Sequence, residues 1–153
     1  MKLNEIASKP KGKVICGFPG VGKSTLFNAL KESGTKVLDS DSSKFDKSKF
    51  PQNYIEHIQK SIDDGYTILA SSHDVVRDAL MDKGIKFTLV YPAIELKDEY
   101  LARYKERGSP EAFITLLDKN WDKWINECKN LKSPLVKKVE LGAKQFVELD
   151  KVK

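Results

Sequence analysis

The chain has 153 residues, of which 40% are hydrophobic and 32% are charged, and its net charge is +5 at pH 7. This length favours a single domain, residues 1–153, with a substantial core, and it excludes a second domain of full size. The lysines are spread along the chain, so the charge favours anionic ligands in general without singling out nucleic acid. No apolar run reaches the length of a membrane span or of a signal peptide core, so we expect a cytoplasmic protein, monomer or homodimer, with no membrane partner.

The first predicted strand, residues 13–16, is followed directly by the sequence GFPGVGKST, residues 17–25. This stretch matches the P-loop pattern G-x-x-x-x-G-K-[ST], and a helix with an apolar side is predicted from residue 26 to residue 30. Strand, glycine-rich loop and helix therefore occur in the order that phosphate binding requires. A turn that only connects a strand to a helix would need neither Lys23 nor Ser24.

A triphosphate needs many N–H donors at close range, and only a loop with little side-chain bulk lets the backbone wrap around it. Lys23 can reach the β- and γ-phosphates, and the Ser24 hydroxyl can ligate Mg²⁺ while the helix directs its positive end toward the anion. The residues expected to bind ATP are Gly17, Pro19, Gly20, Val21, Gly22, Lys23, Ser24 and Thr25.

The second predicted strand, residues 35–38, ends in two carboxylates, Asp39 and Asp41. If the strand continues, these side chains point the same way, because they are two positions apart. One would hold a water molecule of Mg²⁺ and the other would accept a hydrogen bond from an acceptor hydroxyl, with Asp39 and Ser24 expected at the metal. The alternative is a solvated Asp-Ser-Asp turn.

The remaining predicted elements follow at short intervals: a polar loop at 42–53, a helix at 54–62, a strand at 66–70, a helix at 76–80, a strand at 86–91, helices at 94–107 and 113–128, and a final strand at 145–149. This alternation predicts a three-layer α/β domain with a parallel sheet, whose ligands sit at the carboxyl ends of the strands. Trp121 and Trp124 are expected to pack in the core rather than to stack on bases. Cys16 and Cys128 have no metal-ligand spacing and are expected to be buried small hydrophobes.

The turn after the third strand, residues 71–74, has no carboxylate before Asp74, which can serve as a helix cap. Motor and switch ATPases use an acid there to hold the metal, so its absence shifts that role to the second strand. His73 is expected to be a turn residue, since phosphoryl transfer does not require a histidine base. Arg77, one turn into the next helix, is expected to hold an anionic acceptor.

Arg103 and Arg107 lie four positions apart, before the break at 108–110. A short lid would sit there, and its closure would bring the guanidinium groups onto the transferring phosphate. The chain has only three arginines among 27 basic residues, which favours this role. The alternative is surface ion pairs with Glu99, Glu106 or Glu111.

Four stretches together resemble the P-loop kinases of small molecules, the nucleoside monophosphate kinase group that also includes shikimate and gluconate kinases: GFPGVGKST, LDSD, TILASSHDVVRDAL and LARYKERG. The resemblance implies a P-loop NTPase fold, a five-stranded parallel sheet in the order 2-3-1-4-5, a short lid, and transfer of the γ-phosphoryl group of ATP with Mg²⁺. The residues that it implies in catalysis are Lys23, Asp39, Asp41, Arg77, Arg103 and Arg107. The compact size and the lysine-rich composition are similar to those of virus-encoded nucleotide kinases.

The acceptor expected first is a (deoxy)nucleoside monophosphate, because an acceptor that carries a phosphate needs fixed cations. The alternative acceptors are a sugar acid, a nucleoside or a 5′-hydroxyl polynucleotide end, whose backbone the lysine-rich segment 44–49 could follow. A function of another class is a nucleotide-binding regulatory ATPase module that acts with a partner.

Overall fold

Five parallel strands form one sheet in the order β2-β3-β1-β4-β5 in the computed structural model, which describes residues 12–40 and 46–147. The strands are β1 (Lys13–Gly17), β2 (Val37–Asp39), β3 (Thr67–Ser71), β4 (Phe87–Pro92) and β5 (Val136–Leu141). The predicted parallel α/β sheet and its strand order are confirmed. In β1 and β3 almost every residue is buried, as expected for central strands of a sheet that is covered on both faces.

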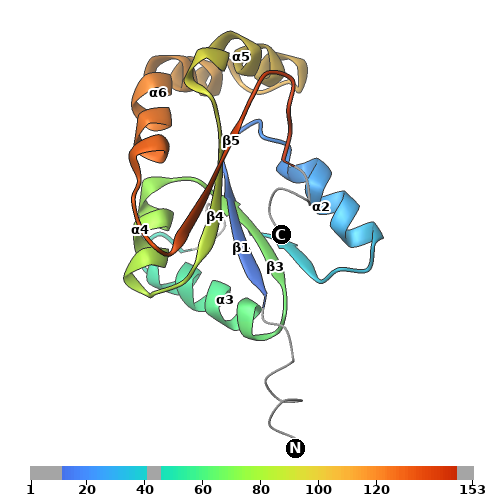
Figure 1. Ribbon diagram of the computed structural model, residues 1–153, viewed down its shortest axis with the longest axis vertical. Coiled ribbons are helices and arrows are strands. Elements are labelled where there is room, and N and C mark those ends of the chain that lie inside the picture. Colours follow the sequence, from blue (N-terminus) through green and yellow to red (C-terminus); the bar gives the residue numbers. More distant parts are fainter. Residues whose placement is uncertain (1–11, 41–45, 148–153) are drawn as a thin grey trace, which may run out of the picture.

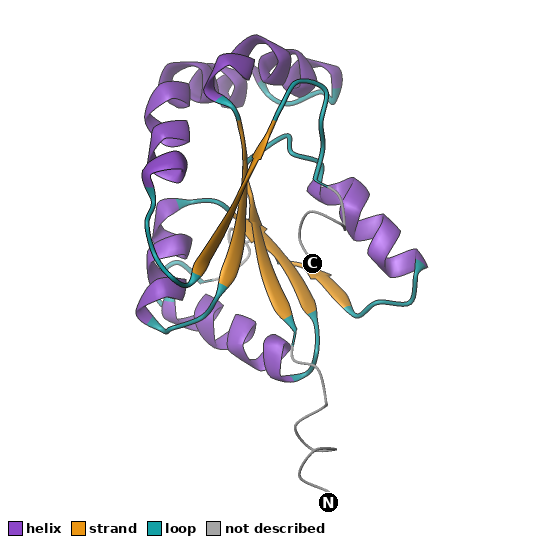
Figure 2. Cartoon of the chain, viewed as in Figure 1, coloured by secondary structure: helices purple, strands orange, loops and turns teal. Residues whose placement is uncertain are grey.

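Helices lie on both sides of this sheet, with α2 on one side and α3, α4 and α6 on the other (Figure 1, Figure 2). Their bounds are α2 (Lys23–Glu32), α3 (Gln52–Asp63), α4 (Asp74–Asp82), α5 (Lys97–Glu106) and α6 (Glu111–Asn130). A short 3-10 helix, Ile94–Leu96, precedes α5, so the helix predicted at 94–107 is divided into two elements. The predicted three-layer arrangement is therefore present.

The register of the sheet determines which turns lie together. Gly17 at the end of β1 is opposite Ser71 of β3 and Val90 of β4. Because all strands are parallel, the loop after β1, the turn after β3 and the segment after β4 meet at one edge of the sheet, where ligands bind in open α/β folds.

The prediction of a final strand at 145–149 is wrong. The fifth strand is β5, an edge strand that pairs with β4 in the register Val90 to Val139, and its Lys137 and Lys138 are exposed. An edge strand of this kind has too much polar surface to be recognised by its sequence. Phe146 and Val147 instead reach the loop after β1, and Leu149 lies outside the described residues.

The predictions about core residues are confirmed for Trp121, Cys16 and Cys128. Trp121 is 1% exposed and donates a hydrogen bond to the Ile94 carbonyl at 2.7 Å, whereas Trp124 is half-buried. Both thiols are free and buried, and burial raises the pKa of Cys16 to about 12 and that of Cys128 to about 11.

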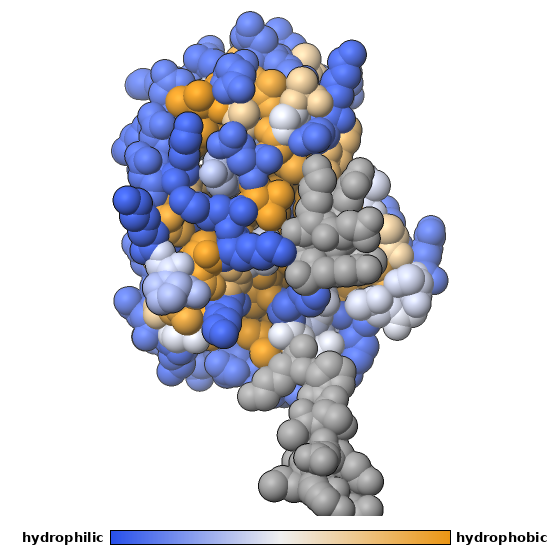
Figure 3. Space-filling view, viewed as in Figure 1, coloured by the Kyte–Doolittle hydropathy of each residue, from blue (hydrophilic) through white to orange (hydrophobic). Residues whose placement is uncertain are grey.

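The surface drawn in Figure 3 is hydrophilic around the outline of the molecule, and apolar residues gather toward its middle. Within residues 12–40 and 46–147, none of the helices combines the length and apolar character needed to cross a membrane.

Candidate active site

The loop between β1 and α2 has a shape that requires its glycines. Gly20 and Gly22 have φ angles of 91° and 99°, a left-handed backbone that residues with a β-carbon rarely adopt. A β-carbon on Gly17 would lie 2.8 Å from the Lys23 Cδ and 2.9 Å from a Val21 methyl group. The glycines predicted from the motif are thus needed for the geometry of the loop as well as for access to its backbone.

The first turn of α2 is open to an anion. The helix is capped by Gly22, which has no side chain to bond the N–H groups of that turn, and the first intrahelical bond runs from Leu26 N to the Gly22 carbonyl at 3.0 Å. Ser24 and Thr25 are exposed on this turn. N–H groups without an intrahelical partner and the positive end of the helix dipole favour an anion such as phosphate at a turn of this kind.

A pocket of about 710 Å³, called here the P-loop pocket, lies over this turn. It is lined by the loop and by Lys23, Ser24, Thr25, Arg103, Glu106, Arg107, Phe113 and Phe146. Its volume is within the range of roughly 300–1,000 Å³ that is usual for ligand sites. The Lys23 ammonium lies 3.4 Å from the Ala70 carbonyl near the end of β3. The pocket lining brings together Lys23, the Ser24 hydroxyl and two of the predicted arginines.

Side chains of helix α5 donate hydrogen bonds to the loop between β1 and α2. Arg103 Nη1 donates to the Gly20 carbonyl at 2.7 Å, and the Tyr104 hydroxyl donates to the Pro19 carbonyl at 2.7 Å. The Tyr100 ring packs so close to Gly20 that a β-carbon there would lie 3.0 Å from it. These contacts join residues 80 or more positions apart, and no local sequence signal marks them.

The Arg103 guanidinium also donates to Glu99 and to Gln145, and these contacts differ from the lid role predicted for this residue. Its Nη2 donates to Glu99 Oε2 at 2.8 Å and to the Gln145 carbonyl at 3.1 Å, and its side chain is 14% exposed. The predicted alternative, an ion pair with Glu99, is therefore present. In this structure Arg103 is a positioning residue that joins the loop to the segment 142–147.

Arg107 is the more accessible of the two arginines. It is exposed at the rim of the P-loop pocket, its Nε donates to Ser109 Oγ at 3.0 Å, and its guanidinium lies 5.0 Å from the centre of the Tyr104 ring. Of the two predicted lid arginines, Arg107 is the one whose side chain is exposed at the pocket.

Phe146 is a pocket residue that the sequence did not reveal, because it was assigned to a strand. The segment 142–147 is fastened by Val147 N, which donates to the Val21 carbonyl at 2.7 Å, and by Lys144 N, which donates to Glu99. This places Phe146, 47% exposed, beside Gly22 and 4.0 Å from the Arg103 guanidinium. An exposed ring supported by a guanidinium is a surface on which a flat base can stack.

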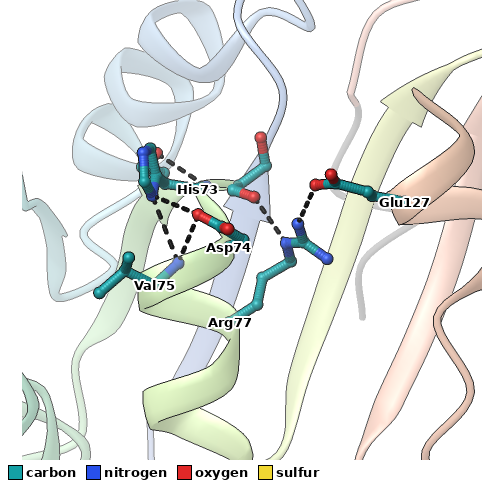
Figure 4. A network of polar contacts seen from close by, with 7 residues as sticks. His73, Asp74, Val75, Arg77 and Glu127 are labelled. Atoms are coloured by element: carbon teal, nitrogen blue, oxygen red, sulfur yellow. Dashed lines mark hydrogen bonds and ion pairs between the residues drawn. The ribbon is translucent and has the colours of Figure 1, made fainter. Parts of the chain in front are cut away.

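A second, smaller pocket of about 120 Å³, called here the β3 pocket, lies at the turn after β3. Arg77 lines it but is only 5% exposed, since its Nε donates to the Ser72 carbonyl at 2.7 Å and its Nη2 to Glu127 at 3.3 Å (Figure 4). The predicted arginine is thus at the expected edge of the sheet, but it is paired with a carboxylate 50 positions away.

His73 and Asp74 also line the β3 pocket and begin α4 (Figure 4). His73 Nδ1 lies 2.9 Å from Asp74 Oδ1 and 3.3 Å from Val75 N, and it cannot donate to the first while accepting from the second. Val75 N has a nearer acceptor in Asp74 Oδ1 at 2.9 Å, so we assign the Nδ1 proton to the bond with Asp74. His73 is the cap residue of α4, as predicted for a turn residue, and its Nε2 is left as an acceptor.

Asp39 ends β2 and is exposed, and it is not among the described residues that line either pocket. The next residue, Ser40, is held firmly: its carbonyl accepts from the Tyr54 hydroxyl at 2.8 Å, and its hydroxyl lies 3.0 Å from His57 Nε2. Asp41 lies outside the described residues. Across the described parts of the chain, no group of three or more His, Cys, Asp or Glu residues could hold a metal by itself.

Comparison of the chain with protein-family models found no match, and comparison with curated proteins found no significant match.

Proposed function

We propose that the chain is a kinase with the P-loop NTPase fold, which transfers the γ-phosphoryl group of ATP to a small acceptor. The strand order, the glycine-rich loop after β1 and the helix that begins at Lys23 agree with that fold. The observation that carries the proposal is the open first turn of α2, with Lys23 and Ser24 facing a pocket large enough for a nucleotide.

The roles follow from the chemistry of phosphoryl transfer, which depends on positioning and on neutralising charge. Lys23 and the N–H groups of the loop would bind the β- and γ-phosphates, and Arg107 would approach the γ-phosphate from the rim of the pocket. Arg103 and Tyr104 would keep the loop in its binding shape.

The donor set fits Mg²⁺ that is bound mainly by phosphate oxygens and water. Ser24 would supply a hydroxyl ligand. Asp39, which is not among the described residues of the pocket lining, or Asp41 would act only through a water molecule of the ion. The bound ion would neutralise charge on the phosphates.

The sequence favoured a (deoxy)nucleoside monophosphate as acceptor because of its three arginines. In the structure Arg77 is paired with Glu127 and Arg103 is bonded to the loop, so this argument for a phosphorylated acceptor retains only Arg107. The acceptor panel should therefore include uncharged compounds as well as monophosphates.

The test is binding of Mg·ATP by calorimetry, followed by transfer from ATP labelled in its γ-phosphate to that panel. Lys23→Ala should abolish tight binding, whereas Lys86→Ala, an exposed lysine at the other end of the sheet, should leave binding unchanged. Equal affinity of both variants and the unchanged protein would refute the proposal.

A further inference from the structure

The β3 pocket has an unusual charge for a site that was expected to receive a phosphate. Of the described residues that line it, one is a cation, Arg77, and two are carboxylates, Asp74 and Glu127. The positive charge of Arg77 is balanced by Glu127 at 3.3 Å and lies in a side chain that is almost wholly buried. Asp74, which accepts from Val75 N and lies 2.9 Å from His73 Nδ1, adds a second carboxylate, so the formal charge of the described lining is one negative and disfavours a further anion.

The β3 pocket adjoins the loop between β1 and α2. Phe18 and Pro19 of the loop form part of its wall, and Pro19 also lines the P-loop pocket. Trp124 of α6 forms an apolar wall, while Ser71 and Ser72 contribute polar groups at the end of β3. A small group seated there therefore lies next to the P-loop pocket, where the proposed nucleotide would bind.

We propose that the β3 pocket receives the hydroxyl end of an uncharged acceptor, a nucleoside or a sugar, and not a phosphorylated one. This inference rests on the proposed kinase function and specifies the class of its acceptor. The small volume suits a hydroxymethyl group or one face of a sugar ring, the aromatic walls suit its apolar side, and the paired arginine leaves no free cation in the described lining to bind a phosphate.

The proposed reaction needs a proton acceptor, and His73, an exposed residue of the pocket lining, can supply one. The acceptor oxygen forms a bond to the γ-phosphorus of ATP, the bond from that phosphorus to the β,γ-bridging oxygen breaks, and ADP leaves with the electron pair. The hydroxyl proton passes to His73 Nε2, whose ring is held by Asp74 through Nδ1. A monophosphate oxygen is already ionised at neutral pH and would need no such base.

The experiment compares matched pairs: thymidine with its 5′-monophosphate, and glucose with glucose 6-phosphate. The kcat/KM of transfer from Mg·ATP and the dissociation constant without ATP are measured for each compound, the latter by tryptophan fluorescence, because Trp124 lines the pocket. We expect at least one uncharged member to be used and bound at least tenfold better than its phosphorylated partner. A phosphorylated member that is used or bound equally well or better, or a lack of binding by all four compounds, would overturn the inference.

Glu127→Gln removes one carboxylate from the pocket and should reduce that preference at least threefold, whereas Glu56→Gln, on the exposed side of α3, should not change it. His73→Asn keeps a good helix cap and should lower transfer to the hydroxyl without changing the affinity for ATP. An unchanged preference in folded Glu127→Gln would count against the charge argument. If that variant does not fold, the comparison of matched pairs on the unchanged protein decides.

Failure of the kinase proposal can be told apart from failure of this one. A protein that binds no ATP, yet binds an uncharged member of a pair in preference to its phosphate, would refute the kinase proposal and support only the preference of the β3 pocket for uncharged compounds. A protein that transfers phosphate to monophosphates only would support the former and refute the latter.

Discussion

Arg103 and Arg107 look equivalent in the sequence but differ in the structure, which makes them a matched pair for mutation. We predict that Arg103→Met destabilises the fold and loosens the P-loop, whereas Arg107→Met leaves the fold unchanged and impairs phosphoryl transfer. Methionine keeps much of the apolar stem of the side chain, so the comparison isolates the guanidinium group.

The magnitude follows from the contacts. Arg103 donates three hydrogen bonds, to Gly20, Glu99 and Gln145, and each contributes about 0.5–1.5 kcal/mol net. Its stacking with Phe146 adds about 0.5–1 kcal/mol. Glu99 keeps its bond from Lys144 N, so little more is lost. The expected decrease in the free energy of unfolding is therefore about 2–5.5 kcal/mol for Arg103→Met. It is less than about 0.5 kcal/mol for the exposed Arg107.

Urea unfolding followed by circular dichroism measures both values, and calorimetry with Mg·ATP measures the effect on the loop. Arg103→Met should also weaken ATP binding, because the Gly20 carbonyl and the segment that carries Phe146 lose their common anchor. Equal stability of the two variants, or a larger loss for Arg107→Met, would refute the assignment of Arg103 as a positioning residue.

Three further predictions concern the loop, the aromatic ring and the thiols. Gly22→Ala should abolish ATP binding measured by calorimetry, while Gly34→Ala, with a similar positive φ but nothing within 4 Å of an added β-carbon, should cost about 1 kcal/mol of stability and leave binding intact. Phe146→Ala should weaken ATP binding about tenfold through loss of stacking, which an unchanged dissociation constant would contradict. Burial raises the pKa of Cys16 and Cys128 above the unfolded value of 9.0, to about 12 and about 11. Their contribution to stability is therefore complete below pH 9.0 and is lost as the pH rises toward about 11–12. Urea unfolding should show that the free energy of unfolding declines above pH 9.0, with no decline from these groups below it.

Much of the fold could be predicted because its signals are local. The buried runs of β1, β3 and β4 and the apolar sides of the helices mark central strands and covering helices. The motif at 17–25 predicts a glycine-rich loop between a strand and a helix by a pattern that needs no distant partner. The position of β5 could not be predicted, since an edge strand is polar on one side and its pairing with β4 depends on the rest of the sheet.

The candidate site likewise combines features that the sequence predicts with contacts that only the structure reveals. The sequence by itself determined the loop, Lys23 and Ser24, and placed Arg77 and Arg107 at the correct edge of the sheet. Only the tertiary structure decided that Arg77 is balanced by Glu127, that Arg103 is bonded to the loop, and that Phe146 lies beside it. The physical reason is that the sequence gives the chemical type of a side chain directly. Whether its charge and its hydrogen-bonding groups remain available for a ligand depends on partners that folding brings from 42 to 83 positions away.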